Sequence, residues 1–319
     1  MFEFLSQGFL SSLFEPISFL TNPGKRIYWL YLLASVLFIF IAYRHSTPLF
    51  MSKVKQTLNI KYWAGRNSLL DMKWIFLNQV LAFLLLVPLL TGQVGWAMSI
   101  YRQLVNWFGA GDFIEWPYWQ VVVLYTLVIF IAEDFTRFLV HYLYHKVPFL
   151  WRFHAIHHSA KVMTPFTLYR IHFVEYVINS CRAVFVLGFI SGIFIYSFNG
   201  AISLYEILGV GVFTLIFNLA GANLRHSHIW LGFGKYERAF ISPAQHQIHH
   251  SSAPKHLDKN FGASLAVWDK LFGTWLASKE EKVTHFGLYR QINRQALKKQ
   301  LLGIKPNKNI GVKNDEEST

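Results

Sequence analysis

The sequence predicts an all-α integral membrane protein, a bundle of about four to five transmembrane helices with a histidine-rich helical cap on its cytoplasmic side. Hydrophobic residues fill 53% of the 319 positions and charged residues only 15%, well below the ~25% of soluble domains. Several apolar stretches approach the ~20 residues that a membrane-spanning helix needs. Lysine and arginine gather in alternate connections between them, as in proteins that cross a bilayer repeatedly.

The first two regions have membrane character but carry no catalytic motif. Residues 1–25 place phenylalanine and leucine at helical intervals among polar residues, which predicts an amphipathic N-terminal segment on the bilayer surface, with an unstructured lead-in as the alternative. Residues 26–116 form an N-terminal transmembrane region. We expect spans at 27–42 and 72–90, followed by an amphipathic stretch at 94–108 in the membrane interface.

The third region, residues 117–277, contains the remaining expected spans and every clustered histidine. One helix begins at Pro117 and runs without a breaker into the first histidine cluster. Spans at 172–198 and 201–220 follow, joined by a tight turn, or this pair forms a hairpin that enters the bilayer and returns. The last region, residues 278–319, is a polar tail, for which we expect a partly helical stretch and then disorder.

The charges in the loops predict which side each connection faces. Loops 43–71 and 132–171 are rich in lysine and arginine, whereas loops 91–116 and 199–200 are poor. Cytoplasmic loops carry such an excess, so five spans would place all histidine clusters in the cytoplasm, although two basic residues before the first span oppose this orientation. The net charge of +13 therefore indicates membrane topology and contact with anionic lipid, not nucleic acid binding.

Eight of the fourteen histidines fall in three short boxes. Residues three or four positions apart share one helix face, so each box directs its imidazoles toward one point. Neutral imidazole is the commonest metal ligand of proteins, and eight exceed the four ligands of a structural zinc site, which predicts two metal ions. Purely structural histidines are the alternative. The boxes are His141 and His145, then His154, His157 and His158, then His246, His249 and His250.

Distinctive residues flank the boxes. Residues 133–135 read EDF before the first box, and residues 150–159 read LWRFHAIHHS. Residues 258–262 and 268–274 read DKNFG and WDKLFGT. Together these stretches resemble signatures of the fatty acid hydroxylase/sterol desaturase superfamily, over about residues 130–277.

This resemblance implies a pair of iron ions that activates O2 to hydroxylate or desaturate a C–H bond of a membrane lipid, with zinc as a substitute in purified protein. It implies that the box histidines are metal ligands. A ninth ligand usually comes from a turn after the last span, where His226 is favoured over His228 by its position in the turn. The histidines without such spacing are expected at solvent or interface positions: His45, His256 and His285.

The resemblance also implies polar side chains near the metal. Residues 169–175, YRIHFVE, are similar to an R-x-H-P-x-E segment of the family, with Phe173 in place of proline. We expect Arg170 and Glu175 to hydrogen-bond ligand histidines, with an interfacial ion pair as the alternative.

Two further carboxylates and one amide are expected near the centre. Asp134 would orient a histidine of the first box, Asp258 would orient the last box, and Asn223 would be a polar neighbour. The first box departs from the family at Phe138 and at Tyr142, which stands where arginine is frequent. The resemblance does not explain Tyr142.

The resulting expectation is an oxidoreductase in the bilayer. No flavin, haem, ferredoxin or cytochrome b5-like motif occurs, so a separate reductase must supply electrons. Hydroxylation is favoured over desaturation, and sterol, fatty acyl, alkyl ether and carotenoid substrates all remain open. The alternatives are a membrane metal-binding or transport protein, whose ligands would lie near mid-membrane on broken helices, and a degenerate scaffold.

Overall fold

The computed structural model of the chain describes residues 15–110, 114–200, 212–288 and 301–303. Every regular element in these ranges is helical, and the only extended pairing there is two isolated bridges. The all-α prediction is therefore confirmed for the described part of the chain. The predicted amphipathic stretch before residue 15, the beginning of the span at 201–220, and most of the tail lie outside the described residues.

Two described helices are long and apolar enough to cross a membrane. One is α5 (Arg66–Phe108), through its segment Arg66–Leu85, and the other is α8 (Phe173–Ser197). Helix α2 (Trp29–Tyr43) is apolar but has 15 residues, fewer than the ~20 that a span needs. Helix α10 (Val212–Leu219) is shorter still.

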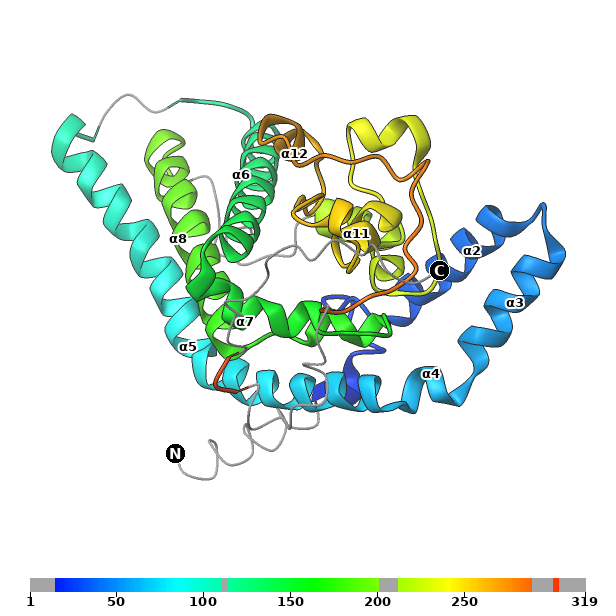
Figure 1. Ribbon diagram of the computed structural model, residues 1–319. Coiled ribbons are helices and arrows are strands. Elements are labelled where there is room, and N and C mark those ends of the chain that lie inside the picture. The colour runs from blue at the N-terminus through cyan, green and yellow to red at the C-terminus, as the bar shows by residue number, and fades with distance from the viewer. Residues whose placement is uncertain (1–14, 111–113, 201–211, 289–300, 304–319) are drawn as a thin grey trace.

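Helix α5 differs from the prediction of a span followed by a separate interfacial stretch. It is one helix of 43 residues with Pro88 inside it, and its ribbon changes direction along its course (Figure 1). The continued part of α5 packs closely against α8. A side chain on Gly188 would meet the backbone oxygen of Gln93 at 2.8 Å, and one on Gly192 would meet Ile100 Cβ at 2.6 Å, so these glycines let the two backbones approach.

Helix α6 (Tyr118–Lys146) runs unbroken into the first histidine box, as predicted. It packs against α8 through a buried cluster that contains Val121, Phe194 and Phe198. Within that contact the Tyr125 hydroxyl lies 2.8 Å from Ser191 Oγ, which satisfies two buried polar groups.

Large apolar side chains point outward from these helices. Leu33, Leu84, Val123 and Phe185 are each at least half exposed. Such outward apolar surface is costly in water and is typical of contact with lipid or another protein.

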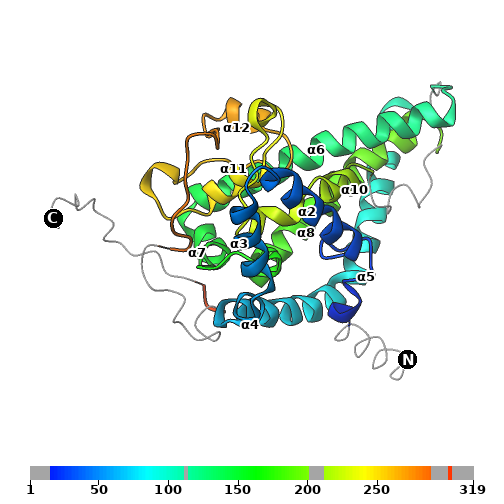
Figure 2. The ribbon, with the colours of Figure 1, turned by 90° about the vertical axis from the view of Figure 1, so that its right-hand side faces the viewer.

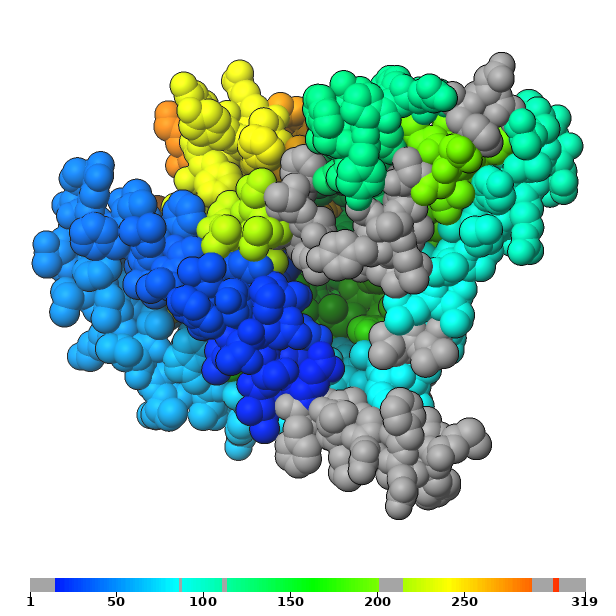
Figure 3. Space-filling model, turned by 180° about the vertical axis from the view of Figure 1, so that it is seen from behind, coloured from blue at the N-terminus to red at the C-terminus, as the bar shows by residue number. Residues whose placement is uncertain are grey.

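Shorter elements gather at one end of the helices. Figure 2 shows α7 (Pro148–His158), α11 (Pro243–His249) and α12 (Val267–Leu271) grouped there, while α6 and α8 extend away. Figure 3 shows the opposite face, which is hollowed between the blue N-terminal atoms and the cyan atoms of α5, with green atoms at the bottom. The remaining described elements are α3 (Thr47–Leu58), α4 (Ile60–Ala64), η1 (Pro165–Tyr169), η2 (Ala222–His226), η3 (Gly234–Arg238) and η4 (Pro254–His256).

Candidate metal centre

Nine histidines converge in two groups at this end of the molecule. Within each group, one ring nitrogen of every residue lies within 4.8 Å of those of the others. The five-histidine group consists of His141, His145, His154, His158 and His249, and the four-histidine group consists of His157, His226, His246 and His250. The structure thus brings together all eight box histidines and His226.

Local structure explains how each box presents its rings. His141 and His145 lie one turn apart in the last turns of α6. Helix α11 begins at Pro243 with a capping box, in which Ser242 Oγ accepts from Gln245 N at 3.1 Å and Gln245 Oε1 accepts from Ser242 N at 3.0 Å. This start fixes the rotation of a helix of only seven residues and so the direction of its histidines.

Gln247 ties α11 to the turn that carries His226. Its buried side-chain amide donates to the carbonyl oxygens of Leu224 at 2.9 Å and Ile229 at 2.7 Å. These bonds bracket His226 and His228. His226 faces the four-histidine group, whereas His228 lies 3.1 Å from Thr57 Oγ1, outside both groups.

The two groups adjoin and share helices. Neighbours in sequence separate into different groups, since His157 and His158 divide between them, and so do His249 and His250. The rings of His158 and His250 stack with centroids 4.4 Å apart. Helix α7 therefore contributes one histidine of its last pair to each group, and the end of α11 does the same.

Ring nitrogens inside the groups face one another at short range. Nε2 of His158 lies 3.1 Å from Nε2 of His145 and 3.1 Å from that of His154. Nε2 of His246 lies 3.1 Å from that of His226 and 3.2 Å from that of His250. Two nitrogens bound at ~2.1 Å to a shared ion would be separated by about 3.0–3.4 Å, so these spacings fit metal ligands.

In the five-histidine group, hydrogen bonds at the Nδ1 atoms, which point away from the centre of the group, determine which Nε2 atoms can bind a metal. We call these the outer and the inner nitrogens. His141 Nδ1 donates to the Phe261 carbonyl and His249 Nδ1 to the Lys259 carbonyl, both at 2.8 Å. The Nε2 atoms of these two histidines are then lone-pair acceptors, and both are buried without a hydrogen-bond partner in the described part of the chain. An unpartnered buried acceptor is costly, and a bound cation would satisfy both.

Burial keeps these histidines neutral, the form that binds metal. It lowers the pKa of His157 to about 4 and holds the pKa values of His158 and His249 well below the ordinary value. The pKa of His226 is also well below the ordinary value. Burial is the main cause, followed by His157 and then by the guanidinium groups of Arg26 and Arg225.

Glu175 lies against a histidine, as expected. His154 Nδ1 donates to Glu175 Oε1 at 3.1 Å, and both side chains are buried. The His154 ring also stacks on Tyr144, with centroids 5.1 Å apart. Glu175 can therefore set the orientation of His154 and keep its proton on Nδ1.

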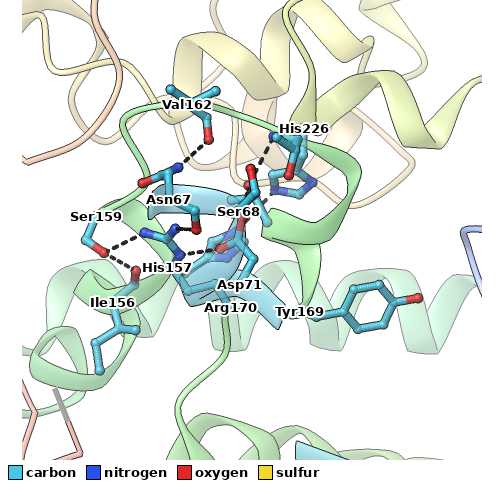
Figure 4. A network of polar contacts seen from close by, with 12 residues as sticks. Asn67, Ser68, Asp71, Ile156, His157, Ser159, Val162, Tyr169, Arg170 and His226 are labelled. Atoms are coloured by element: carbon cyan, nitrogen blue, oxygen red, sulfur yellow. Dashed lines mark hydrogen bonds and ion pairs between the residues drawn. The ribbon is translucent and has the colours of Figure 1, made fainter. Parts of the chain in front are cut away.

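Arg170 contacts a carboxylate in place of a histidine. Its guanidinium pairs with Asp71 in a fully buried ion pair, and it also donates to Ser159 Oγ at 3.2 Å and to the Asn67 carbonyl at 2.8 Å (Figure 4). Arg170 thus braces the end of α7, directly after His158. The sequence reading missed Asp71, although an aspartate entering an apolar run is a signal of a paired charge.

Asp134 and Asp258 do not contact the histidines that we expected each of them to orient. Both oxygens of Asp134 accept from one later segment: Ser264 N at 2.8 Å, Leu265 N at 3.0 Å and Trp268 Nε1 at 2.9 Å. Asp258 lies 3.4 Å from Nδ1 of His145, which belongs to the first box and not the last. Its bond with His145, followed by its contact with Lys146, lowers the pKa of Asp258 to about 2.

The expected position of His256 was wrong, Asn223 bonds to a backbone carbonyl, and Tyr142 gains an explanation. Asn223 donates to the Arg26 carbonyl at 2.6 Å and not to a histidine. His256, expected at a solvent or interface position, is fully buried between Ser251 Oγ and Glu281, each at 2.8 Å. The Tyr142 ring packs on three phenylalanines that support the first box: Phe138, Phe261 and Phe272.

Comparison with known proteins gives a consistent outcome. Residues 126–274 match the fatty acid hydroxylase family. The chain is 27% identical to an ornithine lipid hydroxylase of Rhizobium tropici, covering 60% of this chain and 57% of the relative. It is 28% identical to alkylglycerol monooxygenase of Homo sapiens, covering 51% and 33%, and 26% identical to that of Caenorhabditis elegans, covering 62% and 36%.

The alignments span between a third and just over half of these relatives' lengths. No solved structure matches the chain. The matched region contains all nine clustered histidines together with the acceptors around them.

Proposed function

The chain belongs to the fatty acid hydroxylase superfamily, and on that premise we propose that it is a membrane-bound, iron-dependent oxygenase that hydroxylates a C–H bond of a lipid. The observation that carries this proposal is the convergence of nine buried histidines in two adjoining groups. The relatives' names favour hydroxylation over desaturation. They also favour a lipid with a polar head and a long chain, as in ornithine lipids and alkylglycerols, over a sterol or carotenoid.

The two groups would hold two iron ions, one each. An iron pair bound there would supply the activation of O2, with electrons from a separate reductase. The rest of the chemistry depends on the protein's own groups, and residues 117–277 would form the catalytic domain.

Those groups orient the ligands and keep water away. Glu175 and the carbonyl oxygens of Lys259 and Phe261 hold protons on outer nitrogens, so that the inner nitrogens face the metal. The centroid of the Trp151 ring lies 4.8 Å from that of the His145 ring, and the centroid of the Phe261 ring lies 4.9 Å from it. These aromatic walls would protect the oxidant from water.

The lipid would enter from the bilayer. Helices α5 and α8 are candidate spans, and apolar side chains face outward along α2, α5, α6 and α8. The lipid chain would pass through the recess between the N-terminal part and α5 (Figure 3). In the multi-pass topology we favour, the histidines face the cytoplasm, where a reductase can reach them.

Lipid profiling tests this proposal directly. Cells that produce the wild-type protein should accumulate a lipid heavier by one oxygen atom, and cells that produce His154→Ala or His249→Ala at equal level should not. A product lighter by two hydrogens would replace hydroxylation by desaturation. Lipid profiles identical to those of cells without the protein, with a reductase supplied, would overturn the proposal.

A further inference from the structure

We infer that the two metal sites bind unequally, with the five-histidine group as the tighter site and the four-histidine group as the weaker. This inference rests on the proposed function, because it takes both groups as metal sites. It follows from the different surroundings of the groups: carboxylate and carbonyl oxygens surround the first, and the buried Arg225 adjoins the second.

In the five-histidine group, four outer nitrogens face an oxygen. His154 Nδ1 lies 3.1 Å from Glu175 Oε1, and His145 Nδ1 lies 3.4 Å from Asp258 Oδ1. His141 and His249 donate to backbone carbonyls, as described above. Acceptors on the outer nitrogen orient the ring and raise its basicity toward the metal, and the two carboxylates also offset positive charge placed between the rings.

Three of these acceptors come from one short loop that hydrogen bonds within the protein hold in place. Asp258 and Asn260 adopt left-handed backbone conformations, with φ of 58° and 56°. The buried Asn260 amide donates to the Gln245 carbonyl at 3.2 Å and the Leu276 carbonyl at 3.0 Å. Asp269 accepts from the backbone N–H groups of Phe261 and Gly262, both at 2.7 Å. A site built in advance loses less free energy to ordering when it binds.

The four-histidine group lacks this support. Among the described residues, none of its histidines is within ion-pair distance of a carboxylate. His250 Nδ1 is buried with no hydrogen-bond partner in the same part of the chain. Arg225 directly precedes His226 and is buried, so its guanidinium places a positive charge beside this group, which opposes added positive charge there.

Metal titration tests the inequality without any measurement of turnover. The full-length protein, purified in detergent and stripped of metal, would be titrated with Zn²⁺ alone by calorimetry. We expect two steps of one equivalent each, with the tighter step first. His246→Ala should remove the weaker step and keep the tighter one, while His249→Ala should do the reverse.

Variants around the rings then identify the cause. Asp258→Asn and Glu175→Gln leave all nine imidazoles in place and should weaken the tighter step about 10- to 100-fold, with the weaker step unchanged. Glu133→Gln is the matched control, because Glu133 is a poorly exposed carboxylate on α6 that pairs with Arg182 outside both groups. It should leave both steps unchanged.

The outcomes separate the inference from the function it rests on. Two equal steps in the wild type, or a loss confined to the weaker step in Asp258→Asn and Glu175→Gln, would overturn the inference and leave a two-metal centre. Absence of Zn²⁺ binding to the folded wild-type protein would overturn the metal centre itself. Circular dichroism of each variant checks that the fold is retained, and the two carboxylate variants decide the matter if an alanine variant does not fold.

Discussion

Removing one partner of the buried Arg170–Asp71 pair should destabilise the protein strongly. Both side chains are completely buried. Replacing Arg170 by Met leaves Asp71 without its cation, and it also removes the bonds to Ser159 Oγ and the Asn67 carbonyl. An uncompensated charge of this kind costs about 3–5 kcal/mol.

The magnitude converts into a measurable melting shift. In large domains 1 kcal/mol corresponds to about 2 °C, so Arg170→Met should lower the Tm of the detergent-solubilised protein by about 6–10 °C in a fluorescence melt. Arg137→Ala is the control. Its pair with Glu133 lies within one helix and the arginine is half exposed, so the change should cost at most ~1 kcal/mol.

A double variant separates the lost attraction from the stranded charge. If the penalty comes from the unpaired carboxylate, Arg170→Met combined with Asp71→Leu should recover much of the stability lost in the single variant, because both buried charges are gone. A double variant that is less stable than Arg170→Met would refute this reasoning. So would an Arg170→Met protein that melts within 2 °C of wild type.

Three further predictions concern packing, pH and the first box. Gly192→Leu should cost about 1–3 kcal/mol in a chemical unfolding series, because its Cβ would lie 2.5 Å from the Ala97 carbonyl, whereas Gly95→Ala, with nothing within 4 Å, should not destabilise. The stability of the metal-free protein should fall as the pH drops from 6.5 toward about 4. Over this range His157 binds a proton in the unfolded state but stays neutral in the folded state, because burial lowers its pKa to about 4. Equal Tm values at pH 7.5 and pH 5.5 would contradict this prediction. Tyr142→Phe should keep Zn²⁺ binding and stability within about 0.5 kcal/mol, because only the ring of Tyr142 packs on the neighbouring phenylalanines, and a large loss of binding would mean that the hydroxyl has a role.

Local spacing in the sequence carried most of the information about the histidines. Residues three and four apart share a helix face wherever the helix goes, so the pairing of His141 with His145 could be expected without knowledge of the fold. The choice of His226 over His228 agrees with their positions in the structure. Both predictions could be made without knowledge of contacts between residues far apart in the sequence.

The partners of polar side chains could not be found in the same way. Asp134 reaches residues 264–268, about 130 positions away, and Asp258 reaches His145 across more than 100 positions. Nothing in local periodicity distinguishes a carboxylate that orients a histidine from one that holds a backbone segment. The close packing of α5 is also a long-range feature, since the glycines that allow it lie on α8.

The division of neighbouring histidines between the two groups has a consequence for how the protein is made. Four members of the five-histidine group precede residue 159, so this group is nearly complete once α6 and α7 have left the ribosome. The four-histidine group then has only His157, and it waits for a further stretch of chain that ends at His250. Nascent chains therefore pass through a stage with one partly assembled group and no second one, and the late arrival of α11 completes both at once.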